Sequence, residues 1–451
     1  MRISKRATSI CIMNLLDNKT FLKGPGLALM LIPFFFACED PSELGVRVDS
    51  DNQNIEVKDT TITLPLSTIL IDSLRTNQFT TLLVGHMEDS VTGSVRCTAY
   101  TQYSPASGTF PGDSLDFVSA YISFKINEVR TTDNILSGHI DVHESDDTLY
   151  NQAIYLARRK IDYHPTPITQ LDYNINIDED SVLTFPLNDL GLELYDQLVR
   201  YGTDTAFQDS LQQNLLYYQP LVFNTTSTNS GLMSLSLSND TSALFIKMKS
   251  PSSDSTYYYR FNFNGRGHFT NIERDKAGSK LSTLAEEYTN EVGGGYAYGS
   301  MVDGTFAKLD LTPLKNFITE NTGLIVNNSR IKLNNTDYGS EFVIPFTSVR
   351  FYFIRNGRIN GPIGNSRLTA YTSTILSDLS YSSSSIEYLN AIHEEDPPNY
   401  SGDITQFTQI VADDGLGIDL SEIVILNPTP TSLQKTIFTG AEVTIYYTTI
   451  K

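Results

Sequence analysis

Short segments in which apolar and polar residues alternate run through most of the chain after residue 60. Residues 61–66 and 139–143 alternate strictly, and residues 117–126 form a longer run of the same kind. Successive side chains of a β-strand point to opposite faces, so this alternation predicts antiparallel strands with one buried and one polar face. Gly, Asp and Ser separate the segments, as expected for turns. The pattern therefore predicts an all-β protein.

Leucines with a different period interrupt this pattern. Leu190, Leu194 and Leu198 recur every four residues, which places them on one face of a helix. Residues 205–215 carry a second apolar stripe of the helical kind. We therefore expect a helical insertion at about residues 188–215 within the first group of strands.

An unbroken apolar run occupies residues 26–37. Its twelve residues are too few to span a bilayer and are typical of the core of a secretory signal peptide. The run ends in Ala37 and Cys38, a small residue and a cysteine, which resembles the bacterial lipobox. We expect cleavage before Cys38 and its acylation, with palmitate-like chains that suffice for stable anchoring. An uncleaved anchor is the alternative, and Met13 is a second candidate start.

Acidic residues follow this cysteine directly. Glu39 and Asp40 resemble the surface-export signal of Bacteroidota lipoproteins, whereas the alternative is a tether that is merely acidic. The sequence therefore predicts an outer-membrane protein, anchored through the lipid on Cys38 and facing the cell surface. An orientation toward the periplasm is the alternative.

Changes in composition and in the pattern of apolar residues divide the chain into four parts. Polar residues with little to bury follow Cys38, and a polar, Gly-rich stretch at 266–295 separates two groups of strands. We expect two tandem antiparallel β-sandwiches that resemble jelly rolls. The expected parts are a signal peptide (1–37), a lipidated N-terminus and flexible tether (38–59), a first sandwich with the helical insertion (60–265) and a second sandwich (266–451).

The charge balance and the cysteines limit the partners. The chain has 52 Asp and Glu against 32 Lys and Arg, a net charge of −20. A field of this sign repels phosphate backbones and anionic headgroups, so we expect no nucleic-acid partner and membrane contact only through the lipid. Besides Cys11 and Cys38 the chain has only Cys97, which we expect to be a buried apolar side chain without a disulfide.

One predicted strand carries a candidate metal site. His139, Asp141 and His143 alternate along it and share one face, so two imidazoles and a carboxylate could bind zinc. The alternative is an ordinary solvated face. A second group of acids could supply oxygens to calcium, although its spacing is not that of a calcium loop; its members are Asp413, Asp414, Asp419 and Glu422.

The sequence lacks recognisable catalytic motifs. It contains no Gly-x-Ser-x-Gly, no His-Glu-x-x-His and no phosphate-binding loop, and none of its six histidines neighbours a candidate nucleophile. We therefore expect no cofactor and no enzymatic activity. A hydrolase that uses two carboxylates stays open, because such pairs meet only in the folded chain.

Clustered tyrosines provide another candidate surface. Tyr257, Tyr258 and Tyr259 are consecutive, and Tyr217 and Tyr218 form a pair. Exposed rings could stack on sugars, whereas packing in a core is the commoner role of such residues. Glycans are therefore a candidate partner, although the absence of Trp argues against a dedicated sugar platform.

Asp-Ser and Asp-Thr triplets recur in the first group of strands and resemble the O-glycosylation sequon of exported Bacteroidota proteins. Such pairs also cap helices and open turns. A glycan needs an exposed hydroxyl, so we expect Ser90 and Thr148, which we place in loops, to be usable acceptors. The triplets begin at Asp59, Asp72, Asp89, Asp113, Asp147, Asp180, Asp204 and Asp209.

Five segments are informative through their order along the chain: residues 84–93, 99–103, 271–275, 304–311 and 327–333. Together with the lipobox they resemble a Bacteroidota lipoprotein family defined by domain of unknown function 4270 (DUF4270). The family pattern usually has Asp-Pro where this chain has Asp89-Ser90. The resemblance implies a secreted, all-β lipoprotein and supplies no catalytic residues. Parts of the chain also resemble jelly-roll modules that accompany carbohydrate-active proteins, which is a likeness of fold alone.

These observations predict a non-catalytic binding or accessory subunit of an outer-membrane transport or assembly complex. The basis is the lipid anchor, the tether, the paired sandwiches and the lack of a catalytic motif. A surface protein that resembles a carbohydrate-binding module is the alternative, favoured by the tyrosines. A glycoside hydrolase with a pair of carboxylates is the third hypothesis.

Overall fold

The computed structural model describes residues 55–450 with several gaps, and strands dominate these residues. The predicted signal peptide and Cys38, Glu39 and Asp40 precede the described residues, and the predicted second helical stripe at 205–215 falls in a gap. One compact unit comprises Glu56–Thr449. The gaps are 107–114, 151–152, 178, 180, 188, 204–218, 226–230, 264–266, 289–290, 337–344, 356–357, 363–389, 396–397, 415–420 and 428–432.

Twelve strands of the described residues form one sheet, which we call sheet I. They are β3 (Thr81–Asp89), β4 (Gly93–Thr101), β5 (Ser104–Pro105), β6 (Asp116–Thr131), β7 (Ile135–Glu144), β8 (Thr169–Asn176), β9 (Val182–Leu187), β10 (Leu221–Asn224), β11 (Gly231–Ser236), β12 (Ala243–Lys249), β13 (Thr256–Asn262) and β14 (His268–Asp275). The long strand β6 pairs with β9 and β12 along its first half and with β11 along its second half. These pairings are antiparallel.

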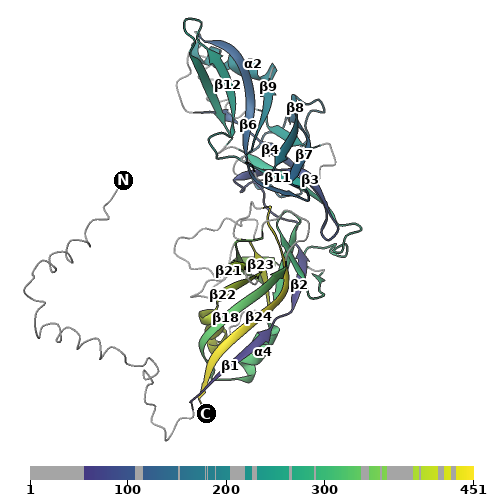
Figure 1. Ribbon diagram of the computed structural model, residues 1–451, viewed down its shortest axis with the longest axis vertical. Helices are drawn as coiled ribbons and strands as arrows, with labels where there is room; N and C mark the ends of the chain where they lie inside the picture. Colours follow the sequence, from purple (N-terminus) through teal and green to yellow (C-terminus); the bar gives the residue numbers. More distant parts are fainter. Residues whose placement is uncertain are drawn as a thin grey trace, which may run out of the picture. The chain divides into compact units, whose positions relative to one another are not determined.

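A second set of twelve strands in the described residues forms sheet II. They are β1 (Ile55–Thr63), β2 (Leu66–Leu70), β15 (Glu291–Val292), β16 (Ala297–Ser300), β17 (Thr305–Asp310), β18 (Ile325–Thr336), β19 (Ser348–Arg355), β20 (Arg358–Pro362), β21 (Asn390–Glu395), β22 (Pro398–Asp403), β23 (Glu422–Leu426) and β24 (Lys435–Ile450). Figure 1 shows β24 beside β18, and β22 pairs along the other side of β18. Because β16 pairs with both β17 and β24, the hydrogen-bonded ladder closes on itself.

Helices occur only as insertions between strands in the part of the chain that the structure describes. They are α2 (Asp189–Thr203), α4 (Thr312–Glu320) and α5 (Thr405–Asp414). α2 is the helix that the leucine period predicts, and its Leu194 and Leu198 are buried. At Gly191 an added Cβ would lie 2.3 Å from the Cβ of Ala120, so the missing side chain lets α2 approach β6 closely. The predicted antiparallel all-β fold with helical insertions is confirmed.

The order of strands along the chain differs from the predicted domain boundaries. β1 and β2 precede sheet I but belong to sheet II, where β2 pairs with β15 and β17. β14 follows residue 265 but pairs with β4 in sheet I. Sheet I is therefore inserted between β2 and β15. Alternation along a strand reports which face is buried and carries no information on the pairing partner, so the sequence pattern alone does not predict this insertion.

Each sheet has its own apolar core, and a third apolar cluster is shared between them. Phe124 is fully buried in the core of sheet I and Phe351 in that of sheet II. The shared cluster, which we call the apolar junction, brings Met87 and Cys97 of sheet I into one cluster with Phe306 of sheet II. Burial raises the pKa of the Cys97 thiol to about 12, and the predicted apolar role of this side chain is confirmed.

The pairing of β3 with β11 requires a glycine. Gly85 has a φ of +132°, a backbone conformation that other residues rarely adopt. A Cβ at this position would lie 2.4 Å from the backbone oxygen of Gly231 in β11. The two backbones therefore approach each other at a point where no side chain fits.

We expect Gly85→Ala to lower the free energy of unfolding by about 2 kcal/mol or more, because backbone strain and the close contact add. Urea unfolding followed by circular dichroism measures this loss. Gly293→Ala is the matched control, since no heavy atom lies within 4 Å of a Cβ built there. The control should stay within about 0.5 kcal/mol of the wild type. Equal stability of Gly85→Ala and the wild type would contradict the close approach of β3 and β11 at this position.

Candidate functional site

The structure brings two of the three predicted zinc ligands together. His139 Nε2 lies 3.0 Å from an oxygen of Asp141, and its Nδ1 lies 2.7 Å from an oxygen of Asp172 in β8. His143 makes a separate contact, with its Nδ1 2.8 Å from the backbone oxygen of His164. Within the described residues, no group of three His, Cys, Asp or Glu side chains is arranged to hold a metal ion. The predicted set of three ligands is therefore not assembled.

The burial of β7 explains this difference. Asp141 and His143 are buried, although the alternating pattern placed them on a polar, solvent-facing side of the strand. His139 stands directly across from Asp172 in the β7–β8 register. The hydrogen bond to Asp172, followed by that to Asp141, raises the pKa of His139 above its ordinary value. The imidazole therefore contacts one carboxylate of its own strand, Asp141, and one of the neighbouring strand β8, Asp172.

The two predicted glycan acceptors differ in their exposure. Ser90 is exposed in the turn after β3, whereas Thr148 is half-buried. The carboxylate of Asp89, which precedes Ser90, accepts hydrogen bonds from the backbone nitrogens of Val91 and Thr92 at 2.6 and 3.0 Å. This triplet therefore also serves as a turn, which is the alternative role of such pairs.

The predicted calcium group is not brought together in the described residues. Glu422 pairs with Lys308 of β17 at 2.8 Å. Asp413 accepts a hydrogen bond from Gln409 one helical turn away. Asp419 lies outside the described residues. The acids that are described are thus occupied by protein partners.

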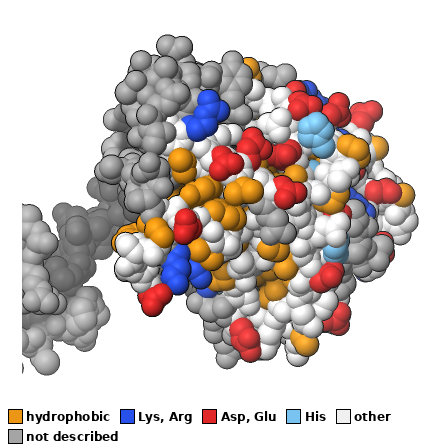
Figure 2. Space-filling model, turned by 90° about the horizontal axis from the view of Figure 1, so that it is seen from above, with side chains coloured by type: hydrophobic (Ala, Val, Ile, Leu, Met, Phe, Trp, Pro, Cys, Tyr) orange, Lys and Arg blue, Asp and Glu red, His pale blue; other side chains and the backbone are white. Residues whose placement is uncertain are grey.

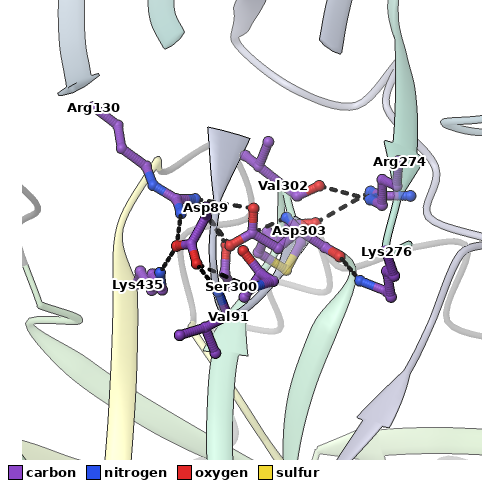
Figure 3. A network of polar contacts seen from close by, with 11 residues as sticks. Asp89, Val91, Arg130, Arg274, Lys276, Ser300, Val302, Asp303 and Lys435 are labelled. Carbon is purple, nitrogen blue, oxygen red and sulfur yellow. Dashed lines mark hydrogen bonds and ion pairs between the residues drawn. The ribbon is translucent and has the colours of Figure 1, made fainter. Parts of the chain in front are cut away.

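Four buried charged side chains meet where the two sheets join (Figure 3). Arg130 of β6 donates to both carboxylate oxygens of Asp303 in the β16–β17 turn, at 3.1 and 2.9 Å. Lys435, which begins β24, pairs with Asp89 at the end of β3. Arg130 also reaches Asp89 at 3.5 Å. We call these four residues the junction charge cluster; their side chains are between 1% and 4% exposed.

Two further cations, Arg274 of β14 and Lys276 directly after this strand, extend the cluster. Arg274 Nε donates to the backbone oxygen of Val302 at 2.6 Å, and the same guanidinium pairs with Asp72. Lys276 Nζ donates to the backbone oxygen of Asp303 at 3.0 Å. Burial lowers the pKa of Lys276 to about 8, although the Asp303 carboxylate opposes this shift. The β16–β17 turn is thus bound to sheet I through its backbone as well as its side chain.

The four charges of the junction charge cluster balance one another. Burial alone would raise the pKa of Asp303, but Arg130 and Lys435 outweigh burial and hold this pKa below its ordinary value. Two of the ion pairs join sheet I to sheet II: in Arg130–Asp303 the cation belongs to sheet I, and in Lys435–Asp89 the cation belongs to sheet II. These side chains are inaccessible to a ligand, so we interpret the cluster as structural.

An exposed arrangement of aromatic side chains lies on sheet I. Across β9, β6, β12 and β13, cross-strand partners share one face, and Pro186, Tyr121, Phe245 and Arg260 form a single row. The rings of Tyr121 and Phe245 are stacked, with 5.3 Å between their centroids and 29° between their planes. Tyr258 belongs to the same face and is 56% exposed. We call these five residues the outer aromatic row.

The opposite face of the same four strands forms the core of sheet I. Ile122, Phe185 and Ile246 alternate with members of the outer aromatic row and are buried. Pro186 has no N–H to donate, and β9 tolerates it because this strand pairs only with β6 among the described strands. The row is therefore held on a backbone that is fixed by packing from behind.

The three consecutive tyrosines are divided between the two faces. Tyr258 lies on the outer face, whereas Tyr257 and Tyr259 pair with Met248 and Ile246 on the inner face. Tyr259 is half-buried against the ring of Phe261, while Tyr257 is 45% exposed at the end of the strand. Of the three consecutive tyrosines, Tyr258 is therefore the one that shares a face with Tyr121 and Phe245. Tyr217 and Tyr218 lie outside the described residues.

A separate hollow of about 620 Å³ is formed by residues of the connection between β7 and β8. Tyr150 and Ile154 on its wall are 63% and 60% exposed. Viewed from above, the molecule shows hydrophobic side chains gathered between acidic ones (Figure 2). The other residues that line the hollow are Asp146, Asp147, Thr148, Ala153, Tyr155, Arg159 and Ile161.

Comparisons with known proteins assign no family. No protein-family model matches the chain, and no curated protein matches it. Among solved structures, the chain is similar to one from Parabacteroides distasonis ATCC 8503, described as "a putative secreted protein", with 9% identity and a TM-score of 0.22 over 86% of this chain and 99% of that chain. A likeness of this extent carries no argument about fold or function. The resemblance to DUF4270 stays a prediction.

None of the helices in the described part of the chain is both long enough and apolar enough to cross a bilayer. This finding leaves the predicted lipid on Cys38 untested, because that residue precedes the described part of the chain.

We expect Asp303→Asn to lower the free energy of unfolding by about 3–5 kcal/mol at neutral pH, because two buried cations would then share one carboxylate. The lowered pKa of Asp303 means that its contribution is present above the ordinary carboxyl pKa and is lost as the pH falls. The difference between the variant and the wild type should therefore shrink on acidification. Urea unfolding at several pH values measures both effects.

The matched control for this experiment is Glu273→Gln, which removes one partner of the exposed ion pair with Lys160. We expect no resolvable change in stability for this variant, because exposed pairs are screened by solvent. Equal losses of unfolding free energy in the two variants would show that the junction charge cluster stabilises the protein no more than an exposed ion pair does.

Proposed function

We propose that this chain is a lipid-anchored, non-catalytic binding protein of the bacterial outer membrane, displayed at the cell surface. The outer aromatic row carries the binding role, since stacked rings on a packed sheet offer apolar area that needs little further ordering on association. The apolar run that ends in Ala37-Cys38, followed by Glu39 and Asp40, supports the location. DUF4270 is the family that we propose for the chain.

A role as the accessory subunit of an envelope transport or assembly complex is the second candidate. The observation that favours it is the hollow of about 620 Å³, where Tyr150 and Ile154 expose more than half of their surface. Tyrosine is enriched among the residues that contribute most of the binding energy at protein interfaces. Purification from detergent-solubilised envelopes tests this role: a stoichiometric membrane protein should accompany the wild type and be lost from Tyr150→Ala.

We expect Cys38→Ser to abolish recovery of the protein in the membrane fraction, because no acyl chain can then be attached. Fractionation of cells followed by a carbonate wash measures this. Cys97→Ser is the matched control, since Cys97 is buried within the fold and has no role in anchoring. Retention of Cys38→Ser in washed membranes would overturn the lipoprotein assignment.

We propose that Ser90 bears a glycan on the native protein. Intact-mass measurement of protein from its native envelope should exceed the mass of polypeptide plus lipid, and Ser90→Ala should remove this excess. Thr148→Ala is the comparison, and because Thr148 is half-buried we expect it to retain the excess. A mass accounted for by polypeptide and lipid alone would reject glycosylation.

A further inference from the structure

We propose that the outer face of β9, β6, β12 and β13 binds an acidic polysaccharide, a glycan whose sugars carry carboxylate or sulfate groups. The proposal rests on the proposed function, because it names the ligand class of the surface that we assign to binding. Three properties of this face carry it: its accessible rings, its hydroxyls and its charge.

Apolar rings form a row across the face. Pro186 is exposed, Tyr121 and Phe245 are half-exposed and stacked, and Tyr258 is exposed beside them. The row crosses four neighbouring strands, so its length is roughly 14 Å at the ordinary strand spacing. The C–H faces of pyranose rings are apolar and flat, and they pack against such surfaces as other apolar groups do. The row is therefore long enough for more than one sugar.

Hydroxyl groups border these rings. Ser119 is half-exposed beside Tyr121 on β6, and Thr184 is exposed on β9. The Tyr121 hydroxyl can donate to a sugar oxygen, because a tyrosine is protonated at neutral pH. Burial and, second, the neighbouring Tyr258 raise the pKa of Tyr121 further. A sugar stacked on the row would thus meet polar groups at its edges, which is the arrangement that orients a polar ligand.

The charge of this face opposes that of the whole chain. The chain has a net charge of −20, yet Lys125 of β6, Lys247 of β12 and Arg260 of β13 occupy outward positions of this face. Lys247 stands between Ser119 and Tyr258 in the register, and Arg260 stands beside Phe245. Lys247 has no ion pair within the described part of the chain. Arg260 pairs at 3.5 Å with Asp240, whose side chain is fully exposed and therefore easily displaced.

Among the described residues of β9, β6, β12 and β13 that face outward, the one acid is Asp116, at the end of the face. Asp116 stands opposite Lys249, which also pairs with Asp254 at 2.9 Å. The middle of the face, beside the stacked rings, thus presents Lys247 and Arg260 toward solvent. Cations next to aromatic rings suit a ligand that combines apolar ring faces with carboxylate or sulfate groups.

The test uses the full chain purified in detergent and titrated with polygalacturonate, dextran sulfate and neutral dextran in physiological salt. We expect binding to polygalacturonate or dextran sulfate, which distinguishes carboxylate from sulfate recognition, and none to neutral dextran. Phe245→Ala and Tyr258→Ala should each weaken binding by about tenfold. Tyr258→Ala removes an exposed side chain, so this variant remains informative if Phe245→Ala fails to fold. Lys247→Gln should weaken binding and reduce its dependence on salt.

Two matched controls address the specificity of this face. Tyr296→Ala removes a tyrosine of sheet II's connecting segment that is 52% exposed, and Lys315→Gln removes an exposed lysine of α4; neither should change binding. The proposal is overturned by absence of polyanion binding, by equal binding to neutral dextran, or by binding that survives both aromatic substitutions. Self-association that is lost in Tyr258→Ala without any glycan binding would likewise overturn it in favour of a second copy as occupant.

The outcome is separable from the proposed membrane anchoring. Cys38→Ser should bind the polyanion as the wild type does while leaving the membrane fraction, because the anchor and the face are far apart in the sequence. If the wild type stays in the membrane fraction but does not bind the polyanions, only the proposed ligand class is refuted and the proposed membrane anchoring stands.

Discussion

Two buried ion pairs of opposite sense connect the sheets of this protein, and the arrangement of the chain depends on them. Arg130 and Asp89 of sheet I meet Asp303 and Lys435 of sheet II. A buried pair adds little net stability over apolar packing, but removal of one partner leaves a costly charge. We therefore attribute the stability of the contact between the sheets to the apolar junction. We attribute the alignment of the two sheets to the charge cluster, because only one alignment brings both ion pairs together.

The insertion of sheet I between β2 and β15 makes this contact necessary. The chain leaves sheet II after Leu70 and returns to it at Glu291. Arg274 and Lys276 bind the β16–β17 turn close to this return, and Asp72 binds Arg274 close to the departure. The two segments in which the chain passes between the sheets therefore lie close to these charged contacts. These contacts fix sheet I to sheet II. Sheet I carries the outer aromatic row on strands whose other face packs in its apolar core.

The sequence predicts the fold class and the first helix because both leave a local period. It does not predict the insertion, since pairing between distant strands leaves no local signal. The candidate binding face was missed for the same reason. Phe245 lies within the almost wholly apolar run Ala243–Lys249, which hides its outward orientation, and its partner Tyr121 is far away in sequence. The zinc hypothesis for His139, Asp141 and His143 assumed a solvated strand face, whereas Asp141 and His143 are buried.

We expect both sheets to unfold as one cooperative body, because they share the apolar junction and the junction charge cluster. Hydrogen exchange measured at increasing urea tests it directly, by comparing the slowest amides of β6 in sheet I with those of β18 in sheet II. If the apolar junction and the charge cluster couple the sheets, the two sets of amides should lose protection at the same urea concentration and with the same dependence on urea. Loss of protection in one sheet at a clearly lower concentration, while the other stays protected, would contradict the account.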